Sequence, residues 1–346
     1  MTGHLAHGFP TVLGRGLLGE FRNFANPPVL VVTMPDLWGL FARHFEGCDH
    51  RVHFTTSIER ADLDREAMAL TDVGSVVGLG GGQALDAAKW FAWRRGLPLF
   101  QAPTALSVNA VYSHRSGVRD GGRVRYLGWA VPECVFMDYD VLRAAPPRLN
   151  WSGIGDVLCF HTGVLDWAYA RDRGRGDPRW PWDEGLAAQS LAKVDRIVEA
   201  AEDIRALTDR GIEALVDGLK WGTSFHGAGW CPAHIEGTDH FLFYALERRT
   251  GRRFLHGQPV GLGVVLGSLL HDSGADRMIE AIATVGLDVR PPAMGVTWEE
   301  AEDALLSLRD FVRSEPLWHS IAHDERVTPA LVRTLRARLD RAYGAA

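Results

Sequence analysis

The sequence predicts an α/β domain with a mostly parallel sheet, followed by an all-helical domain. In the first part of the chain, short apolar runs alternate with segments of good helix propensity, which is typical of a parallel sheet packed against helices. After about residue 148 the pattern becomes a series of helices with no convincing strand between them. The change coincides with Pro146-Pro147, so we expect domains over residues 1–148 and 149–346.

Each expected strand of the first domain is a β-rich, mostly apolar run bounded by turn residues. The expected strands are 29–33, 52–55, 73–79, 97–104 and 131–137. Helices are expected over 37–45 and 62–71, and in the alanine-rich segment that follows the three glycines at 80–82. Residues 111–126 alternate in polarity and carry glycines at turn positions, which predicts a β-hairpin.

The second domain is predicted from long segments without strand signals. The expected helices are 151–170, 184–205, 207–220, 238–249, 260–271, 298–312 and 329–343. The last of these has Thr328 as a suitable cap and Pro329 at the first helical position. The segment 171–183 is rich in Arg, Gly, Pro and Trp, which predicts an exposed loop. Its Trp180-Pro181-Trp182 fits either a subunit interface or a segment packed onto its own chain.

Composition and charge narrow the class of protein. The chain of 346 residues is 46% apolar and 23% charged, which is ordinary for a soluble globular protein. A net charge of −6 argues against a general nucleic-acid binder, because binding to the phosphate backbone needs a basic surface. The longest apolar run, Pro259–Leu270, is too short to span a membrane. We therefore expect a cytoplasmic protein with no nucleic-acid or membrane partner. As a separate expectation, not drawn from composition, we expect a homo-oligomer.

The cysteines give no strong signal. Four cysteines are scattered without a CxxC spacing, so we expect reduced thiols. Cys159 and His161, together with Cys231 and His234, offer zinc-like ligand types, but neither spacing fits a known zinc-finger pair well.

The most informative stretch is a strand followed by Gly80, Gly81 and Gly82 and a helix start. Unpaired backbone N–H groups and the positive end of the helix dipole at such a turn attract an anion. Glycines let the backbone approach a pyrophosphate without a Cβ in between. A tight turn with no ligand fits about equally well. Asp86 and Lys89, one helical turn apart, also fit an exposed surface pair.

A second candidate site consists of Asp156, His240 and His256. An Asp and two His from separate segments can converge as a three-ligand site, and catalytic metals favour three protein ligands with one open position. With 14 histidines in the chain, this pattern on its own is a weak signal, and core histidines are the plainer interpretation.

Five motifs in a fixed order strengthen both interpretations, the anion site at the glycine turn and the three-ligand metal site. They are Gly-Gly-Gly-x-x-x-Asp-x-x-Lys ending at Lys89, Pro-Thr-x-x-Ser ending at Ser107, Gly-x-Gly-Asp ending at Asp156, Asp-His ending at His240, and His256-Gly257. This order resembles the iron-containing alcohol dehydrogenase and dehydroquinate synthase superfamily. Within it the chain looks most like the sn-glycerol-1-phosphate dehydrogenases, with similarity from about residue 28 to 270.

The resemblance implies a Rossmann-like first domain, a helical second domain, and the dehydroquinate synthase-like fold. It implies a divalent metal, most often zinc with iron or nickel as other options, and NAD or NADP as the cofactor. It implies specific residues for each group: Asp156, His240 and His256 for the metal, Gly80, Gly81, Gly82 and Asp86 for the dinucleotide phosphates and neighbouring groups, and Thr104 and Ser107 at the nicotinamide end. The implied substrate is a small-molecule hydroxyketone or polyol that carries a phosphate group, as in the most similar family.

The chain departs from the family pattern at its substrate end. Asn109 stands where an Asp usually faces the substrate, and Tyr244 stands where a second His usually follows the metal His. We assign both to catalytic positions, although Asn109 cannot act as a base and Tyr244 is a poor one near neutral pH. Gln258 replaces a common Glu in the neighbourhood of His256. Met34 lies where NAD-preferring relatives often carry an acid, so NADP stays open.

Three functions are compatible with these residues. The leading one is a metal-dependent NAD(P)(H) oxidoreductase that interconverts a small hydroxyketone phosphate and its alcohol. A sugar-phosphate cyclase of the dehydroquinate synthase type is a second, although such lyases generally use a Glu as the first metal ligand where this chain has Asp156. A non-catalytic relative is the third, because Asn109 and Tyr244 both differ from the family pattern.

Overall fold

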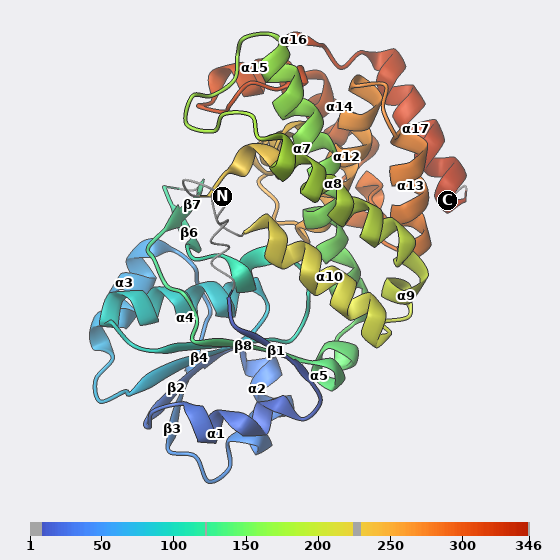
Figure 1. Cartoon of the computed structure of the whole chain (residues 1–346). Coiled ribbons are helices and arrows are strands. Elements are labelled where there is room, and N and C mark those ends of the chain that lie inside the picture. Colours follow the sequence, from blue (N-terminus) through green and yellow to red (C-terminus); the bar gives the residue numbers. More distant parts are fainter. Residues whose placement is uncertain (1–8, 122, 224–229, 345–346) are drawn as a thin grey trace. The chain divides into compact units, whose positions relative to one another are not determined.

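The computed structural model describes residues 9–121, 123–223 and 230–344, and Figure 1 shows its course. The chain divides into two compact units, one that ends at Pro146 and one that starts at Pro147. None of the described helices is long and apolar enough to cross a membrane.

The first unit is built on a six-stranded sheet in which every neighbouring pair is parallel. The strand order is β1-β8-β5-β4-β2-β3. The strands are β1 (Thr11–Gly14), β2 (Val29–Thr33), β3 (His50–Phe54), β4 (Ser75–Gly80), β5 (Leu99–Pro103) and β8 (Cys134–Asp138). All five expected strands are present, and β1 is an additional edge strand that the sequence did not predict.

The sheet buries both of its faces, which explains the continuous apolar runs. Alternate residues of β2 belong to different clusters: Val29 and Val31 pack on one face, and Leu30 and Val32 pack on the other. Helices and short 3-10 turns cover these faces. They are η1 (Leu17–Glu20), α1 (Phe21–Phe24), α2 (Pro35–Phe41), η2 (Ala42–Phe45), α3 (Arg60–Ala69), α4 (Gly82–Arg95), η3 (Asn109–Tyr112) and α5 (Tyr139–Ala144).

The expected hairpin is confirmed. Strands β6 (Ser116–Asp120) and β7 (Arg123–Leu127) form a separate antiparallel pair, with Ser116 opposite Leu127. The hairpin follows η3, so its first strand lies close in sequence to Ser107 and Asn109.

Helices are the only regular elements among the described residues of the second unit, and they run from green to red in Figure 1. Each expected helix is present, several of them divided into two, and α13 is a helix that the sequence analysis omitted. The elements are α6 (Pro147–Trp151), η4 (Ser152–Ile154), α7 (Gly155–Asp172), α8 (Glu184–Glu199), α9 (Ala201–Arg205), α10 (Asp209–Gly222), η5 (Pro232–His234), α11 (Thr238–Thr250), α12 (Gly257–Leu270), α13 (Ala275–Val285), η6 (Pro291–Met294), α14 (Trp298–Leu306), α15 (Leu308–Ser314), α16 (Ile321–Asp324) and α17 (Pro329–Tyr343).

The Trp-rich segment after α7 packs onto its own unit. The rings of Trp182 and Trp167 have centroids 4.8 Å apart, and the Trp167 indole N–H donates to the Trp180 carbonyl at 3.0 Å. Trp180 also meets Trp318 edge to face at 5.2 Å. Of the two interpretations of this segment, the structure has the packed one.

Candidate active site

The glycine turn joins β4 to α4 at the carboxyl edge of the parallel sheet, where α/β folds commonly bind ligands. Gly80 has φ 154°, and a Cβ there would lie only 2.9 Å from the Cβ of Ala84, so a larger residue would clash. A Cβ at Gly81 would meet no atom within 4 Å. The backbone N–H groups at the start of α4 are therefore approachable, as an anion site at a helix N-terminus requires.

The segment after β5 lies next to this turn. The Thr104 backbone N–H donates to the Gly80 carbonyl at 3.0 Å, and the Thr104 side chain is buried. Ser107 and Asn109 are half-buried on the loop that follows. A Cβ on Gly82 would lie 3.2 Å from Val108 Cγ1, so this loop contacts the start of α4. The predicted cofactor residues of the first unit thus gather in one place.

Asp86 and Lys89 form a buried pair, so the exposed-pair interpretation is wrong. The Lys89 side chain is fully buried, and its Nζ lies 2.7 Å from Asp86 Oδ1. It also donates to the carbonyls of Ala110 at 2.8 Å and Arg115 at 2.7 Å. A buried ammonium is tolerated because its donors are satisfied in this way. This Lys89 cluster ties α4 to the Ser107–Asn109 loop and to the hairpin, and direct contact of Asp86 with a dinucleotide stays a prediction.

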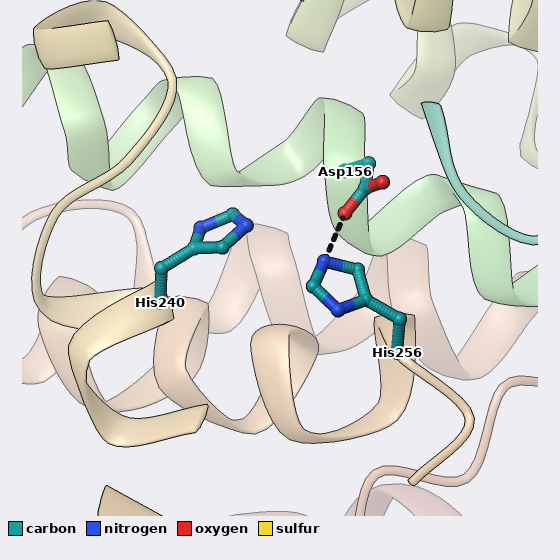
Figure 2. Close-up of side chains that lie close together, drawn as sticks. All are labelled: Asp156, His240 and His256. Carbon is teal, nitrogen blue, oxygen red and sulfur yellow. Dashed lines mark ion pairs between the residues drawn. The ribbon is translucent and has the colours of Figure 1, made fainter. Parts of the chain in front are cut away.

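Asp156, His240 and His256 converge within the second unit. Asp156 is the second residue of α7, His240 is the third residue of α11, and His256 immediately precedes α12. Figure 2 shows the three side chains turned toward one another. One ligand atom from each lies within 4.8 Å of the others, and His256 Nε2 is 2.9 Å from Asp156 Oδ1. A carboxylate oxygen with two imidazole nitrogens is a donor set that suits zinc and related divalent ions.

Two glycines allow this convergence. Gly155 precedes Asp156 and Gly257 follows His256, and a Cβ on Gly155 would lie 2.6 Å from the Gly257 Cα. A Cβ on Gly257 would lie 1.7 Å from the carbonyl oxygen of Ser152. The starts of α7 and α12 can approach this closely only because both residues lack a side chain. The Gly257 N–H also donates to Ser152 Oγ at 3.0 Å, which fixes the start of α12.

Asp239 orients His240. Its Oδ1 lies 2.5 Å from His240 Nδ1, so that Nε2 is the nitrogen left to bind a metal. The other oxygen of Asp239 accepts a hydrogen bond from the Thr162 hydroxyl at 2.6 Å, and both residues are fully buried. A Cβ on Gly263 would lie 2.4 Å from the Asp239 carbonyl oxygen, so α12 packs directly against this part of α11.

The electrostatics of the site fit a cation. Burial alone would lower the pKa of His240, but the hydrogen bond to Asp239 and the charges of Glu236, Asp239 and Asp156 outweigh it and raise that pKa to about 9. The same surroundings that favour a proton on His240 favour a divalent ion in its place. The residues present therefore fit a bound divalent metal.

Tyr244 and Glu236 lie at the same site. Tyr244 is half-buried one turn after His240, and its hydroxyl donates to Glu236 Oε2 at 3.4 Å. Burial raises the pKa of Glu236, while the nearby His240 and His256 oppose this shift. Glu236 was not among the predicted site residues, because a single Glu before Gly237 carries no periodicity or motif that marks it.

The proposed cysteine–histidine zinc pairs do not assemble as such. His234 bonds with Ser190 Oγ at 2.8 Å, and Cys231 lies in an apolar cluster with Trp167 and Ala233. Cys159 instead lies behind the metal candidate, where its Sγ is within 4.8 Å of ligand atoms of Asp239 and His240. Burial, together with the nearby carboxylates, raises the pKa of the Cys159 thiol well above its usual range, so it is held protonated.

Comparison with known proteins gives the family. A family model described as iron-containing alcohol dehydrogenase matches residues 42–146. The glycerol-1-phosphate dehydrogenase of Thermofilum pendens is 30% identical over 298 residues, which is 84% of each chain. The chain belongs to the glycerol-1-phosphate dehydrogenase family. Another member of this family, from Hyperthermus butylicus, is 28% identical over 302 residues, again 84% of each chain.

Solved structures share the fold of this family member. A probable glycerol dehydrogenase from Sinorhizobium meliloti superposes with a TM-score of 0.74 at 20% identity and covers 100% of this chain and 99% of its own. Glycerol dehydrogenase from Schizosaccharomyces pombe gives 0.70 at 19% identity, covering 97% of this chain and 90% of its own. The expected fold class, an α/β unit with a parallel sheet followed by a helical unit, is confirmed.

Proposed function

We propose that this glycerol-1-phosphate dehydrogenase family member is a metal-dependent NAD(P)(H) oxidoreductase that interconverts a small hydroxyketone phosphate and its alcohol. The observation that carries the proposal is the convergence of Asp156, His240 and His256 from three helix starts. The named activity of the relatives supports the substrate class. We assign dinucleotide binding to residues 1–148, and metal and substrate binding to residues 149–346.

The chemistry divides between bound groups and the chain. A divalent ion supplies Lewis-acid polarisation of a carbonyl oxygen, and a nicotinamide supplies hydride. Asp156, His240 and His256 would hold the ion, and Asp239 keeps His240 in the orientation that presents Nε2. Zinc is our preferred ion, because three protein ligands and an open fourth position are typical of catalytic zinc sites.

The dinucleotide would bind at the glycine turn. Gly80, Gly81 and Gly82 leave backbone N–H groups open to its phosphates, and Thr104 and Ser107 lie beside the turn for the nicotinamide end. Asn109 would hydrogen-bond a substrate hydroxyl, and Tyr244, whose one hydroxyl proton is directed at Glu236, would accept a hydrogen bond from the substrate. Both NAD and NADP are candidates for this position.

The test is an oxidation assay with NADH and NADPH, dihydroxyacetone phosphate and the zinc-loaded protein, beside a chelator-treated sample. We expect metal-dependent cofactor oxidation, and its loss in a His256→Ala variant. Cofactor binding in the wild type without any turnover of this or other hydroxyketones would show a non-catalytic relative instead.

We also propose a homo-oligomer. The support is β1, an edge strand of the sheet on which Val12 is 44% exposed and Leu13 is 37% exposed. Light scattering after size-exclusion chromatography gives the mass directly, and a monomer at micromolar concentration would contradict the proposal.

A further inference from the structure

We propose that Glu236 recognises a hydroxyl group adjacent to the carbonyl of the substrate, so that this site selects hydroxyketones over simple ketones. The inference rests on the proposed function and assigns Glu236 as a specificity-determining residue of that site. Its basis is the fixed backbone of Glu236 and the position of its carboxylate, which accepts a hydrogen bond from Tyr244, whose ring lies 6.3 Å from that of His240.

The exposure of the side chains identifies the open face of the site. Asp156, Asp239 and His240 are all buried, with 6% exposure at most. His256, Tyr244 and Glu236 are the half-exposed members of the group. We expect a substrate to approach the metal along these three side chains, and Glu236 is the one carboxylate among them.

The position of Glu236 is fixed from both sides. Its backbone N–H donates to the Pro232 carbonyl at 2.9 Å, and its own carbonyl accepts the Trp318 indole N–H at 3.0 Å. The next residue, Gly237, packs directly against Asp166 of α7, because a Cβ on Gly237 would lie only 2.3 Å from Asp166 Oδ2. A carboxylate on such a rigid support can hold a hydrogen-bonding partner in a defined place.

The carboxylate of Glu236 has capacity for a further donor. The Tyr244 hydroxyl occupies Oε2, and within the described residues no hydrogen bond reaches Oε1. An ionised carboxylate only accepts hydrogen bonds, so its natural ligand is a donor such as a substrate hydroxyl. A simple ketone has no such donor.

The charge of the site points the same way. Asp156, Asp239 and Glu236 place three carboxyl groups around the site, which disfavours a further anion beside them. The end of the substrate at the metal is therefore expected to be an uncharged hydroxyl, with any phosphate group held away from Glu236. A site that hydrogen-bonds a hydroxyl discriminates against the analogue that lacks it, because the acceptor then loses its partner.

A binding experiment tests this without relying on turnover. Hydroxyacetone and acetone differ by one hydroxyl, and each can be titrated into the cobalt-loaded protein while the visible spectrum of the metal is followed. We expect the wild type to prefer hydroxyacetone by about 10- to 100-fold, the range of a hydrogen bond to a charged group. In Glu236→Ala the ratio should fall to about 1, and Glu236→Gln should be intermediate because its amide oxygen still accepts.

Controls separate recognition from structure. Tyr244→Phe should keep or raise the preference, because it frees Oε2, and Glu325→Ala, an exposed glutamate of the same unit, should leave the ratio unchanged. Metal content is measured for every variant. A wild-type ratio near 1, or an unchanged ratio in Glu236→Ala and Glu236→Gln, overturns the inference. Hydride transfer with an unchanged ratio would uphold the proposed function and overturn the role of Glu236, whereas selective binding without hydride transfer would do the reverse.

Discussion

Asp166 holds the start of the helix that carries His240, through a 2.6 Å hydrogen bond from the Thr238 backbone N–H to its Oδ2. Its other oxygen accepts from the Ile321 N–H and lies near His271 Nε2, both at 2.9 Å. Asp166 is 1% exposed, so a single buried carboxylate joins α7 to the starts of α11 and α16. The candidate metal site therefore depends on Asp166, a residue that has no hydrogen bond or ion pair with the predicted metal ligands.

Asp166→Asn should destabilise the protein and weaken metal binding together. The amide keeps the shape of the side chain but directs an NH2 group at one of the backbone donors, so a buried donor loses its acceptor. We expect a loss of about 2–3 kcal/mol in the free energy of unfolding, measured by urea denaturation. The exposed Asp272→Asn serves as the control, and equal stability of the two variants would contradict the role given to Asp166.

Gly257→Ala should disrupt the candidate metal site. The added Cβ would overlap the Ser152 carbonyl at 1.7 Å, so the start of α12 and His256 must move. We expect at least 2–4 kcal/mol of destabilisation and a zinc content well below that of the wild type. Gly39→Ala, where a Cβ meets nothing within 4 Å in a helix, should be neutral or slightly stabilising. Full zinc occupancy in Gly257→Ala would refute the close-packing argument.

Metal removal should lower the stability of the protein, and by more the tighter the metal binds. A ligand that binds only the folded state at 100 times its Kd stabilises it by about 2.7 kcal/mol. We therefore expect a chelator to lower the melting temperature of the wild type by several degrees. Asp156→Asn should show a much smaller response, while Asp195→Asn, a surface change in the same unit, should behave as the wild type. Melting curves that ignore the chelator would argue against a resident metal.

Lys89→Met should show how much the Lys89 cluster contributes to the stability of the folded protein. The substitution removes three interactions and leaves Asp86 buried without its counter-ion, so we expect about 3–5 kcal/mol of destabilisation. Combining it with Asp86→Asn should recover part of the loss, because the uncompensated charge is then gone. If the double variant is less stable than the sum of the single changes, the pair is not the unit we describe.

Stability should fall with acidification partly through His114. Burial, with Arg115 and Lys89 nearby, lowers the pKa of His114 to about 4. Below pH 6.5 the unfolded chain binds a proton at this residue while the folded chain does not, so folding stability drops as the pH falls from about 6.5 to 4. We expect His114→Gln to remove about 1–2 kcal/mol of the difference between pH 7.5 and 5, after allowance for solvent screening. Parallel pH profiles for the two proteins would count against this assignment.

The elements that the sequence predicts well are those whose residue pattern follows directly from their burial. Strands β2, β4, β5 and β8 are apolar because they are buried on both faces, and this burial is visible in the sequence. Strand β1 was not predicted because Thr11–Gly14 is short and two of its four residues are exposed. Helix α13 is an amphipathic segment between Gly274 and Gly286 that the sequence analysis passed over.

The residues of the candidate site also differ in how far the sequence predicts them. Asp156, His240 and His256 could be named only because their order matched a known family; their spacing alone left core histidines as the plainer interpretation. The burial of Lys89 could not be predicted, since its two carbonyl partners, Ala110 in η3 and Arg115 before β6, are distant in sequence and carry no motif. Thr162 acts through a contact with Asp239 that forms only when α7 and α11 pack, and Glu236 contacts Tyr244 eight residues later.

Strand β1 also sets a condition on how the first unit can form. Its only pairing partner among the described strands is β8, with Thr11 opposite Val135, so the first and last strands of the unit close the sheet together. During synthesis β1 leaves the ribosome early and must remain unpaired until β8 has followed. The closure is a long-range contact, which makes it a slow step of folding. Until it occurs, the apolar flank of β8 is an open sheet edge, and the nascent chain is at its most vulnerable to association with other chains.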